Sequence, residues 1–221
     1  MRVGETLKPA LLAALIALAA LVQARQAKSQ EQAVLTVAGG CFWCVEADFE
    51  RVPGVIEAIS GYTGGTVANP TYKQVTGGNT GHYEAVQIRF DPSKVSRRQL
   101  LELFVRSIDP TDAGGQFCDR GDSYRSAVFA QDAGEAALAR QVLKEAQKAL
   151  GRKVVTPVME ARPFFRAEDY HQDYYKGTDL VFTRYGPKRQ AAAYKRYREA
   201  CGRDTRVTEL WGDAAPFAAG H

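Results

Sequence analysis

The sequence is poor in cysteine, and this scarcity excludes several classes of protein. Its 221 residues include 4 cysteines, too few for a scaffold built on disulfides but enough for redox chemistry. A structural zinc site would need a second close pair of cysteines or histidines, whereas Cys118 and Cys201 each stand alone. We therefore expect no metal.

Strong charge of one sign, internal repeats and low-complexity segments are also missing. Lysine and arginine total 29 against 25 aspartates and glutamates, for a net charge of +4. No basic stripe alternates with aromatic residues, so nucleic acid is not an expected partner. The composition, 45% hydrophobic and 24% charged, excludes a disordered chain, a collagen and a polytopic membrane protein.

The N-terminal apolar run is short for a membrane-spanning helix. It covers Ala10–Val22 after a positively charged start, whereas a span needs roughly 20 residues. The chain then reads Val22-Gln23-Ala24, close to a signal peptidase site. We predict a signal peptide over residues 1–24 and a polar linker over 25–32. The alternative is an uncleaved N-terminal anchor.

Removal of the leader leaves one domain of ordinary size, which we place at residues 33–221 with a helical C-terminal tail. An exported chain, periplasmic or extracellular, meets an oxidising compartment in which cysteines tend to pair. A catalytic thiol there needs a dedicated source of electrons. Nothing in the sequence demands a second subunit, so a monomer is expected.

Hydrophobic periodicity predicts strands that alternate irregularly with helices, which favours an α+β fold over a doubly wound sheet. Glycine-rich loops are expected over residues 61–82 and 109–122. The expected strands are 34–38, 55–60, 83–90, 127–130 and 154–159, and the expected helices are 41–52, one from 96, 132–150, 167–175 and 190–200, with a tail at 210–211.

The segment Gly39-Gly40-Cys41-Phe42-Trp43-Cys44 carries the strongest chemical signal. The glycines let the chain turn from strand to helix, which places Cys41 in the first helical turn. Free N–H groups and the helix dipole there favour a thiolate, the form that attacks sulfur. Cys44 follows at a spacing that suits an internal disulfide. A buried structural pair is the alternative interpretation.

Glu84 is the second unusual residue. On the predicted strand over residues 83–90 it shares one face with a valine, an isoleucine and a phenylalanine. A charged carboxylate there is costly, so a raised pKa and a role as proton donor are expected. The alternative is a glutamate at the strand end that simply reaches water.

Further short motifs follow these two in a fixed order over roughly residues 33–185. They are Pro53-Gly54-Val55, Gly61-Tyr62-Thr63-Gly64-Gly65, Asn69-Pro70-Thr71-Tyr72, Thr80-Gly81-His82, Glu84-Ala85-Val86, Asp109-Pro110-Thr111, Asp119-Arg120-Gly121, Ser123-Tyr124-Arg125-Ser126-Ala127 and Ala167-Glu168-Asp169-Tyr170-His171-Gln172. Together with Gly-Cys-Phe-Trp, the set resembles the A-type peptide methionine sulfoxide reductases.

The resemblance implies a role for each matching residue. Cys41 would be the nucleophile and Glu84 the acid that protonates the sulfoxide oxygen. Phe42 and Trp43 would hold the methyl group of the substrate. The residues expected to assist at the oxygen, Tyr72 and Tyr124 as hydroxyl donors and Asp119 as an orienting group, could otherwise be packed aromatics and a turn-capping aspartate. For His82 and His171 we expect packed or hydrogen-bonded roles.

The resolving cysteine stays open at this stage. Many family members have glycine at the position of Cys44 and use a cysteine near the C-terminus. We rank the candidates as Cys44, then Cys201, then Cys118. Cys201 could also act as a relay that passes a disulfide outward.

The fold implied is an α+β two-layer sandwich with a mixed, largely antiparallel sheet, ferredoxin-like and rich in coil. The activity implied is reduction of the S epimer of methionine sulfoxide, in proteins, in peptides and as the free amino acid. The route implied is a sulfenic acid and an intramolecular disulfide, which a thioredoxin-like donor reduces without metal or bound cofactor.

Two other functions compete with this one. A thiol–disulfide oxidoreductase also places C-x-x-C at a helix start, although the rest of this chain does not match such proteins. A non-enzymatic module that binds methionine sulfoxide would not need Cys41.

Overall fold

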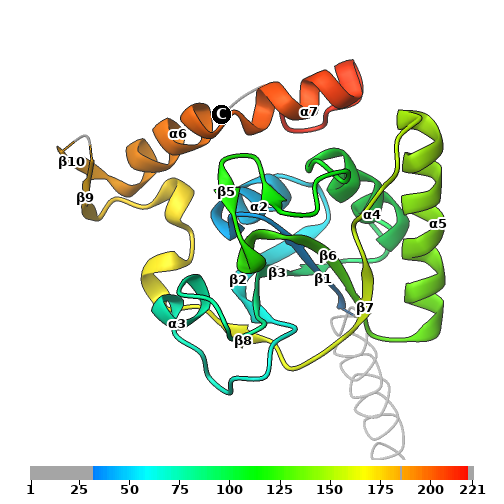
Figure 1. Ribbon diagram of the computed structural model, residues 1–221, viewed down its shortest axis with the longest axis horizontal. Helices are drawn as coiled ribbons and strands as arrows, with labels where there is room; N and C mark the ends of the chain where they lie inside the picture. The colour runs from blue at the N-terminus through cyan, green and yellow to red at the C-terminus, as the bar shows by residue number, and fades with distance from the viewer. Residues whose placement is uncertain (1–31, 185, 219–221) are drawn as a thin grey trace, which may run out of the picture. The chain divides into compact units, whose positions relative to one another are not determined.

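A six-stranded mixed sheet lies at the centre of the protein (Figure 1). The computed structural model describes residues 32–184 and 186–218. The sheet order is β7-β6-β1-β3-β2-β8, and all neighbours are antiparallel except β6 and β7. Its strands are β1 (Ala33–Gly39), β2 (Val55–Thr63), β3 (Tyr83–Phe90), β6 (Ser126–Ala130), β7 (Val158–Glu160) and β8 (Phe165–Arg166).

The central strands have the ferredoxin-like arrangement that was predicted. Along the chain the order is β1, helix α2 (Phe42–Phe49), β2, β3, helix α4 (Arg97–Arg106) and β6. In the sheet these four strands lie in the order β6-β1-β3-β2. The α+β class with a mixed, largely antiparallel sheet is therefore confirmed. The predicted leader over 1–24 lies outside the described residues, as does the linker up to residue 31, so that division stays a prediction.

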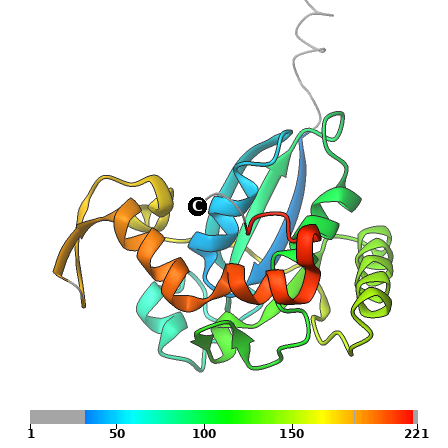
Figure 2. The same ribbon diagram turned by 90° about the horizontal axis from the view of Figure 1, so that it is seen from above.

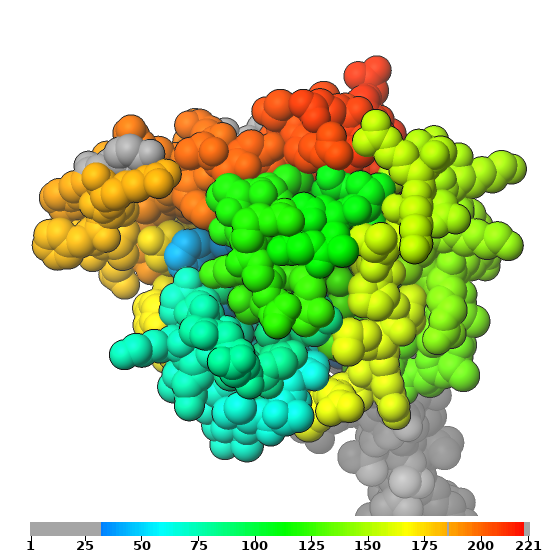
Figure 3. Space-filling view, viewed as in Figure 1, coloured from blue at the N-terminus to red at the C-terminus, as the bar shows by residue number. Residues whose placement is uncertain are grey.

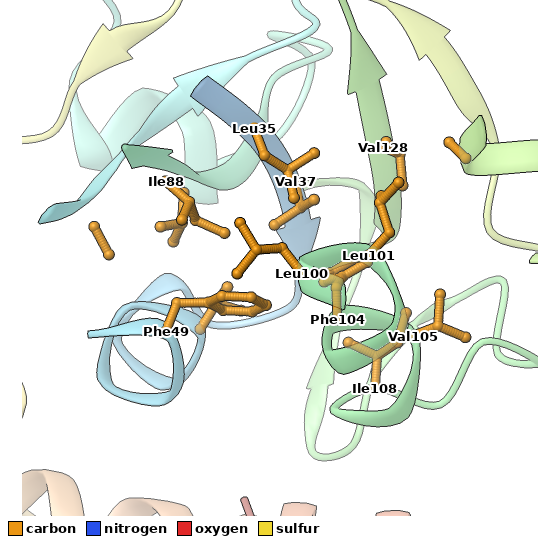
Figure 4. Close-up of a cluster of buried hydrophobic side chains, with 14 of the residues drawn as sticks. Leu35, Val37, Phe49, Ile88, Leu100, Leu101, Phe104, Val105, Ile108 and Val128 are labelled. Atoms are coloured by element: carbon orange, nitrogen blue, oxygen red, sulfur yellow. The ribbon is translucent and has the colours of Figure 1, made fainter. Parts of the chain in front are cut away.

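The main core lies between one sheet face and a helical layer, as Figure 4 shows. Side chains alternate along each strand, so Leu35 and Val37 of β1 point to this face together with Ile88 and Val128. They meet a layer formed by α2, α4 and α5 (Ala133–Leu150). Burial of each such side chain stabilises the fold by about 1.5–3 kcal/mol. The core thus holds β1 and α2, and the turn between them, in one place.

Local signals account for the bounds of these helices. Ser96 caps α4 with a capping box, and the Asp132 side chain accepts from the N–H of Glu135 at the start of α5. Gly151 ends α5 in the left-handed conformation, as predicted. Within the described residues, no helix combines the length and the apolar character needed to cross a membrane.

Several predicted elements differ from the structure. The strand expected over 154–159 is reduced to β7, which lies at the edge of the sheet and pairs only with β6. The helix expected over 167–175 is two short 3₁₀ turns, η2 (Asp169–His171) and η3 (Tyr174–Lys176), because Asp173 between them has φ +55. The expected tail at 210–211 is the end of a helix, α7 (Arg203–Trp211).

Short elements also occur where loops were expected. Helix α3 (Tyr72–Thr76) lies inside the predicted loop 61–82, and a capping box between Thr71 and Gln74 begins it. The helix expected over 190–200 is α6 (Gln190–Cys201). The remaining elements are β4 (Gly115–Gln116), β5 (Asp119–Arg120), η1 (Asp122–Tyr124), β9 (Leu180–Thr183), β10 (Gly186–Arg189) and η4 (Gly212–Ala214).

Helices α6 and α7 run in succession across the protein, in orange and red in Figure 2. Helix α6 reaches α2 through an ion pair between Arg198 and Asp48. The end of α7 contributes Trp211, which packs against the main core. The C-terminal segment is therefore part of the folded unit and borders the start of α2.

A candidate active site at the start of helix α2

The turn from β1 into α2 presents Cys41 at the N-cap position, directly before the first residue of the helix, Phe42. Gly40 has φ +80, and a Cβ there would approach Gln116 Cβ to 2.6 Å. Only glycine combines this backbone conformation with this close approach. Cys41 follows as the N-cap residue of α2, and its carbonyl accepts from the N–H of Cys44 at 3.1 Å.

Distant segments of the chain meet around Cys41. Figure 3 shows the loop with α3, the β4–β5 segment and α6 gathered on one face. A cavity of about 60 Å³ there is lined by Cys41, Phe42, Trp43, Tyr72, Glu84, Asp119, Tyr124 and Tyr197. Seven of these residues were predicted from the sequence as one site, and the structure brings all seven together.

A larger groove of about 430 Å³ adjoins this cavity. Trp43 and Tyr197 line both spaces, so the two meet across these side chains. The groove also contacts Cys118 and Cys201, two of the predicted resolving candidates. Cys44, the third candidate, lines neither space. The structure thus separates the four cysteines into an outer pair, Cys118 and Cys201, and an inner pair, Cys41 and Cys44.

Glu84 is buried at the end of β3, with 2% of its surface exposed. One oxygen accepts a hydrogen bond from the Phe42 N–H at 3.1 Å. Burial, and to a smaller extent the Asp119 charge, raises the pKa of Glu84 to about 8, against the lowering effect of that hydrogen bond. The raised pKa expected from the strand pattern is present, so Glu84 carries a proton at neutral pH.

Two tyrosine hydroxyls face the same cavity as Glu84. Burial raises the pKa of Tyr72 and of Tyr124 well above that of a free phenol, so both groups stay protonated donors. The N–H of Tyr72 donates to a Glu168 carboxylate oxygen at 2.9 Å, and the other oxygen accepts from Tyr62 Oη at 2.9 Å. Glu168 therefore holds Tyr72 in place.

Aromatic contacts fix the apolar wall of the cavity. The Trp43 ring stacks on Tyr174 with centroids 3.9 Å apart, and its Nε1–H donates to His171 Nδ1 at 3.1 Å. His171 also packs on Phe42 at 5.0 Å, and burial lowers the pKa of His171 to about 4. His171 is thus a neutral, hydrogen-bonded support for the wall. His82 likewise has a hydrogen-bonded role, because its Nδ1 accepts from Gly65 N–H at 3.2 Å.

The four cysteines form one disulfide and one free pair. Cys118 and Cys201 are joined across 83 residues of sequence, with a Cα–Cα distance of 4.9 Å. Cys41 and Cys44 are free and buried. The sequence left the pairing open, because neither Cys118 nor Cys201 has a close cysteine neighbour along the chain.

The electrostatics of the free pair differ from the sequence-based expectation. Burial raises the pKa of the Cys41 thiol, so the resting thiolate expected at this position is not favoured. The first helical N–H, that of Phe42, donates to Glu84 instead. A hydrogen bond from Cys41 lowers the pKa of Cys44 to about 7, with further lowering by Arg203 and Arg198. Of the two thiols, Cys44 is therefore the one that loses its proton more readily.

Tyr197 belongs to the site although sequence reasoning did not select it. Its hydroxyl donates to an Asp119 carboxylate oxygen, and its ring meets Trp43 edge-on at 6.1 Å. Burial raises the pKa of Asp119, and the hydrogen bond from Tyr197 opposes that shift. The only signal in the sequence was its position one helical turn before Cys201.

Two groups of described side chains lie close enough to share a metal ion, and both have other partners. In the group of Cys118, Asp119 and Cys201, the two sulfurs are bonded to each other. In the other group, the Glu46 carboxylate accepts hydrogen bonds from Ser60 and Asp173, and Glu50 accepts from Tyr175 and Lys176. Neither group has the free donor set that a metal centre needs.

Comparison with known proteins gives consistent matches. A family model described as peptide methionine sulfoxide reductase matches residues 33–210. Peptide methionine sulfoxide reductase MsrA 2 of Rhizobium meliloti (strain 1021) is 46% identical over 195 residues, which cover 88% of this chain and 91% of that protein. Two solved structures each share 30% identity and cover 66% of this chain. Reduced Mxr1 from Saccharomyces cerevisiae has a TM-score of 0.63 over 84% of its own chain, and methionine sulfoxide reductase A of Corynebacterium diphtheriae has 0.61 over 74%.

Proposed function

The chain belongs to the peptide methionine sulfoxide reductase family, and we propose that it reduces the S epimer of methionine sulfoxide, in polypeptides and as the free amino acid. The observation that carries the proposal is the composition of the small cavity. A thiol, a protonated carboxyl group and two phenol hydroxyls converge there beside an aromatic wall. These are the groups that reduction of a sulfoxide by a thiol requires.

In the first step, Cys41 attacks the substrate sulfur. A sulfoxide oxygen is a poor leaving group until it is protonated, and Glu84 is the buried acid that can supply the proton. Tyr72 and Tyr124 donate hydrogen bonds to the oxygen while the charge on it changes. Methionine leaves with its sulfur reduced by two electrons, and Cys41 takes up the oxygen as a sulfenic acid. The proton of the Cys41 thiol passes to the Glu84 carboxylate and restores the acid.

The aromatic wall seats the substrate for this attack. Phe42 and Trp43 hold the methyl group, since both rings line the cavity beside Cys41. The Trp43 ring cannot turn freely, because it is stacked on Tyr174 and bonded to His171. Asp119, held by the Tyr197 hydroxyl, orients the polar part of the substrate.

Cys44 resolves the sulfenic acid. Cys118 and Cys201 are already bonded to each other, whereas Cys44 is free and hydrogen-bonded to Cys41. The S–O bond of Cys41 breaks, an S–S bond to Cys44 forms, and the oxygen leaves as water. An external dithiol of the thioredoxin type then reduces the disulfide. The chain uses no metal or bound cofactor in this scheme.

We also propose that the protein is exported and acts as a monomer. The pattern over residues 1–24 supports export, and the Cys118–Cys201 disulfide is of the kind that persists in oxidising compartments. A mature chain beginning at Arg25, measured by mass, would agree with cleavage, whereas an intact leader would indicate the anchored form.

A single turnover without reductant tests the proposed function. The chain, reduced at Cys41 and Cys44, is mixed with methionine S-sulfoxide; methionine is counted and disulfides are mapped by peptide mass. We expect about one methionine per chain and a new Cys41–Cys44 bond. Cys41→Ser should release none. A bond from Cys41 to Cys118 or Cys201 would overturn the resolving role of Cys44.

The same experiment separates the competing functions. A folded, reduced chain that releases no methionine would favour thiol–disulfide exchange instead. A module that only binds methionine sulfoxide would retain its affinity in the Cys41→Ser variant and would also release no methionine.

A further inference from the structure

Two fully buried arginines lie at the junction of the C-terminal helices. Arg198 near the end of α6 and Arg203 at the start of α7 are each 2% exposed. Gly202 between the helices has φ +73, the left-handed conformation in which α6 ends. Arginine is almost never buried without a partner for its charge. Each guanidinium group must therefore have hydrogen-bond acceptors or a counter-charge in its buried surroundings.

Arg203 is held by backbone carbonyls and an aromatic ring. Its guanidinium donates to the Ser107 carbonyl at 3.0 Å and to the Gly39 carbonyl, and it lies 4.6 Å from the centroid of the Phe117 ring. Among the residues that the structure describes, no carboxylate forms an ion pair with it. Gly39 ends β1 two residues before Cys41, so this positive charge is held at the turn that carries the dithiol.

Arg198 reaches the dithiol from the other C-terminal helix. It forms ion pairs with the buried Asp48 at 2.9 Å and with Asp204 at 2.7 Å. It also donates to the Tyr194 hydroxyl at 3.1 Å, and Tyr194 belongs to the same buried cluster as Cys44. Arg198 thus brings a positive charge near Cys44 together with two negative partners, Asp48 and Asp204.

Cys44 therefore has charged or titratable neighbours on every element packed against it. Its buried environment takes in Cys41 and Asp48 from α2, Glu84 from β3, Tyr174 from η3, Tyr194, Tyr197 and Arg198 from α6, and Arg203 from α7. The hydrogen bond from Cys41 has the largest effect on the pKa of Cys44, and Arg203 and Arg198 lower it further, whereas burial and Asp48 raise it.

We propose that Arg203, with Arg198, is a positioning residue that keeps Cys44 as the thiolate that attacks the Cys41 sulfenic acid. This inference rests on the proposed function. A thiolate, not a thiol, is the attacking form. Once Cys41 is oxidised its thiol proton is gone, and the buried arginine charges continue to stabilise the Cys44 anion.

The step balances without any further reactant. The Cys44 sulfur is oxidised as the S–S bond forms, and the Cys41 sulfur is reduced from the sulfenic to the disulfide level. The S–O bond of Cys41 breaks, and the departing hydroxide takes a proton from solvent to leave as water. The arginines touch no reacting bond, and they act only through the charge on Cys44.

A thiolate titration tests the charge effect directly. In the full-length Cys41→Ser variant with the outer disulfide intact, Cys44 is the sole free thiol, and serine retains a hydroxyl donor. Absorbance at 240 nm against pH gives the titration midpoint of Cys44. Adding Arg203→Met should raise the midpoint by about one pH unit or more, which leaves about fivefold less thiolate at pH 7 when the midpoint starts near 7. Arg203→Lys, which keeps the positive charge, should leave the midpoint close to that of the Cys41→Ser variant.

The matched control lies on the same helix. Arg206 forms its ion pairs with Asp109 and Glu209, away from the dithiol, so Arg206→Met should leave the midpoint unchanged. If the Arg203→Met variant does not fold, the Asp48→Asn variant tests the effect of a buried charge on the Cys44 midpoint with the opposite sign. Removing the negative charge of Asp48 should lower the midpoint.

Single-turnover kinetics with Cys41 present complete the test. Arg203→Met should slow formation of the Cys41–Cys44 disulfide about fivefold at neutral pH, with recovery at high pH, while methionine release keeps its rate. An unchanged midpoint, or equal slowing of methionine release and disulfide formation, would overturn the inference. Failure of the proposed function itself would look different, since the wild-type chain would then release no methionine.

Discussion

At the scale of single residues, Glu84 shows how burial alone prepares a group for chemistry. It is 2% exposed, and its pKa rises from the usual 4.5 to about 8 mainly through loss of solvation. The proton is therefore present below about pH 8 and is lost above it. The first half-reaction should decline as pH rises through about 8.

Replacing Glu84 tests this pH dependence. Glu84→Gln keeps the size and polarity of the side chain but cannot give up a proton. We expect methionine release to fall by roughly 10²–10⁴-fold, the range for a lost general acid, and to lose its decline near pH 8. Stopped single turnovers from pH 6 to 9 would measure both effects. A variant that keeps the wild-type rate and profile would remove Glu84 from the mechanism.

The same pKa has a consequence for stability. Because the folded pKa is raised, the folded chain keeps a proton that the unfolded chain loses between about pH 4.5 and 8. The contribution of Glu84 to the free energy of unfolding is therefore full below this window and decreases as pH rises through it. In Glu84→Gln this part of the pH dependence should disappear.

At the scale of elements, the turn between β1 and α2 determines where the nucleophile lies. Gly40 combines φ +80 with a backbone so close to Gln116 that a Cβ would clash at 2.6 Å. The β4–β5 segment therefore packs directly against the turn that carries Cys41. This contact also places Asp119, three residues after Gln116, beside the thiol.

Alanine substitutions at two glycines separate the cost of backbone strain from the cost of steric overlap. Gly78 has a similar φ of +86 but open space around its Cβ position. Gly78→Ala should cost about 1 kcal/mol in the free energy of unfolding, from backbone strain alone. Gly40→Ala should cost about 3 kcal/mol, because overpacking adds to the strain. Urea denaturation followed by circular dichroism would measure both, and equal costs would contradict the role assigned to close packing at Gly40.

At the scale of the whole molecule, the outer disulfide joins the two segments that complete the site. Cys118 precedes Asp119, and Cys201 follows Tyr197 by one helical turn, so the bond ties both pocket residues together. It closes a long loop of the chain, with a sequence separation of 83. Such a cross-link mainly limits the freedom of the unfolded chain.

Removing that cross-link gives a prediction for global stability. The double variant Cys118→Ser/Cys201→Ser should lose about 2–4 kcal/mol in the free energy of unfolding. Wild-type chain treated with reductant should lose a similar amount, whereas the double variant should not respond to reductant. A wild-type chain whose unfolding curve is the same with and without reductant would argue against a stabilising disulfide.

Local sequence patterns were sufficient to predict part of the fold and part of the candidate site. Strand alternation on β3 marked Glu84 as a carboxyl group on an apolar face, and the glycines before Cys41 marked a turn into a helix. These features depend on neighbours within a few residues, so the sequence alone determines them. The ordered motifs, through their resemblance to a known family, were sufficient to predict that five further residues share one pocket. These residues are Phe42, Trp43, Tyr72, Asp119 and Tyr124.

Tertiary structure decided the rest. Pairing of Cys118 with Cys201, the hydrogen bond from Tyr197 to Asp119, and the burial of Arg198 and Arg203 beside Cys44 all join segments that lie far apart in the sequence. Such contacts depend on how the C-terminal helices pack against α2 and the β4–β5 segment. No local periodicity encodes that packing, because each helix presents the same pattern wherever it docks. The sequence by itself thus determined the chemistry of the inner thiol turn, and only the packed fold decided which charges surround it.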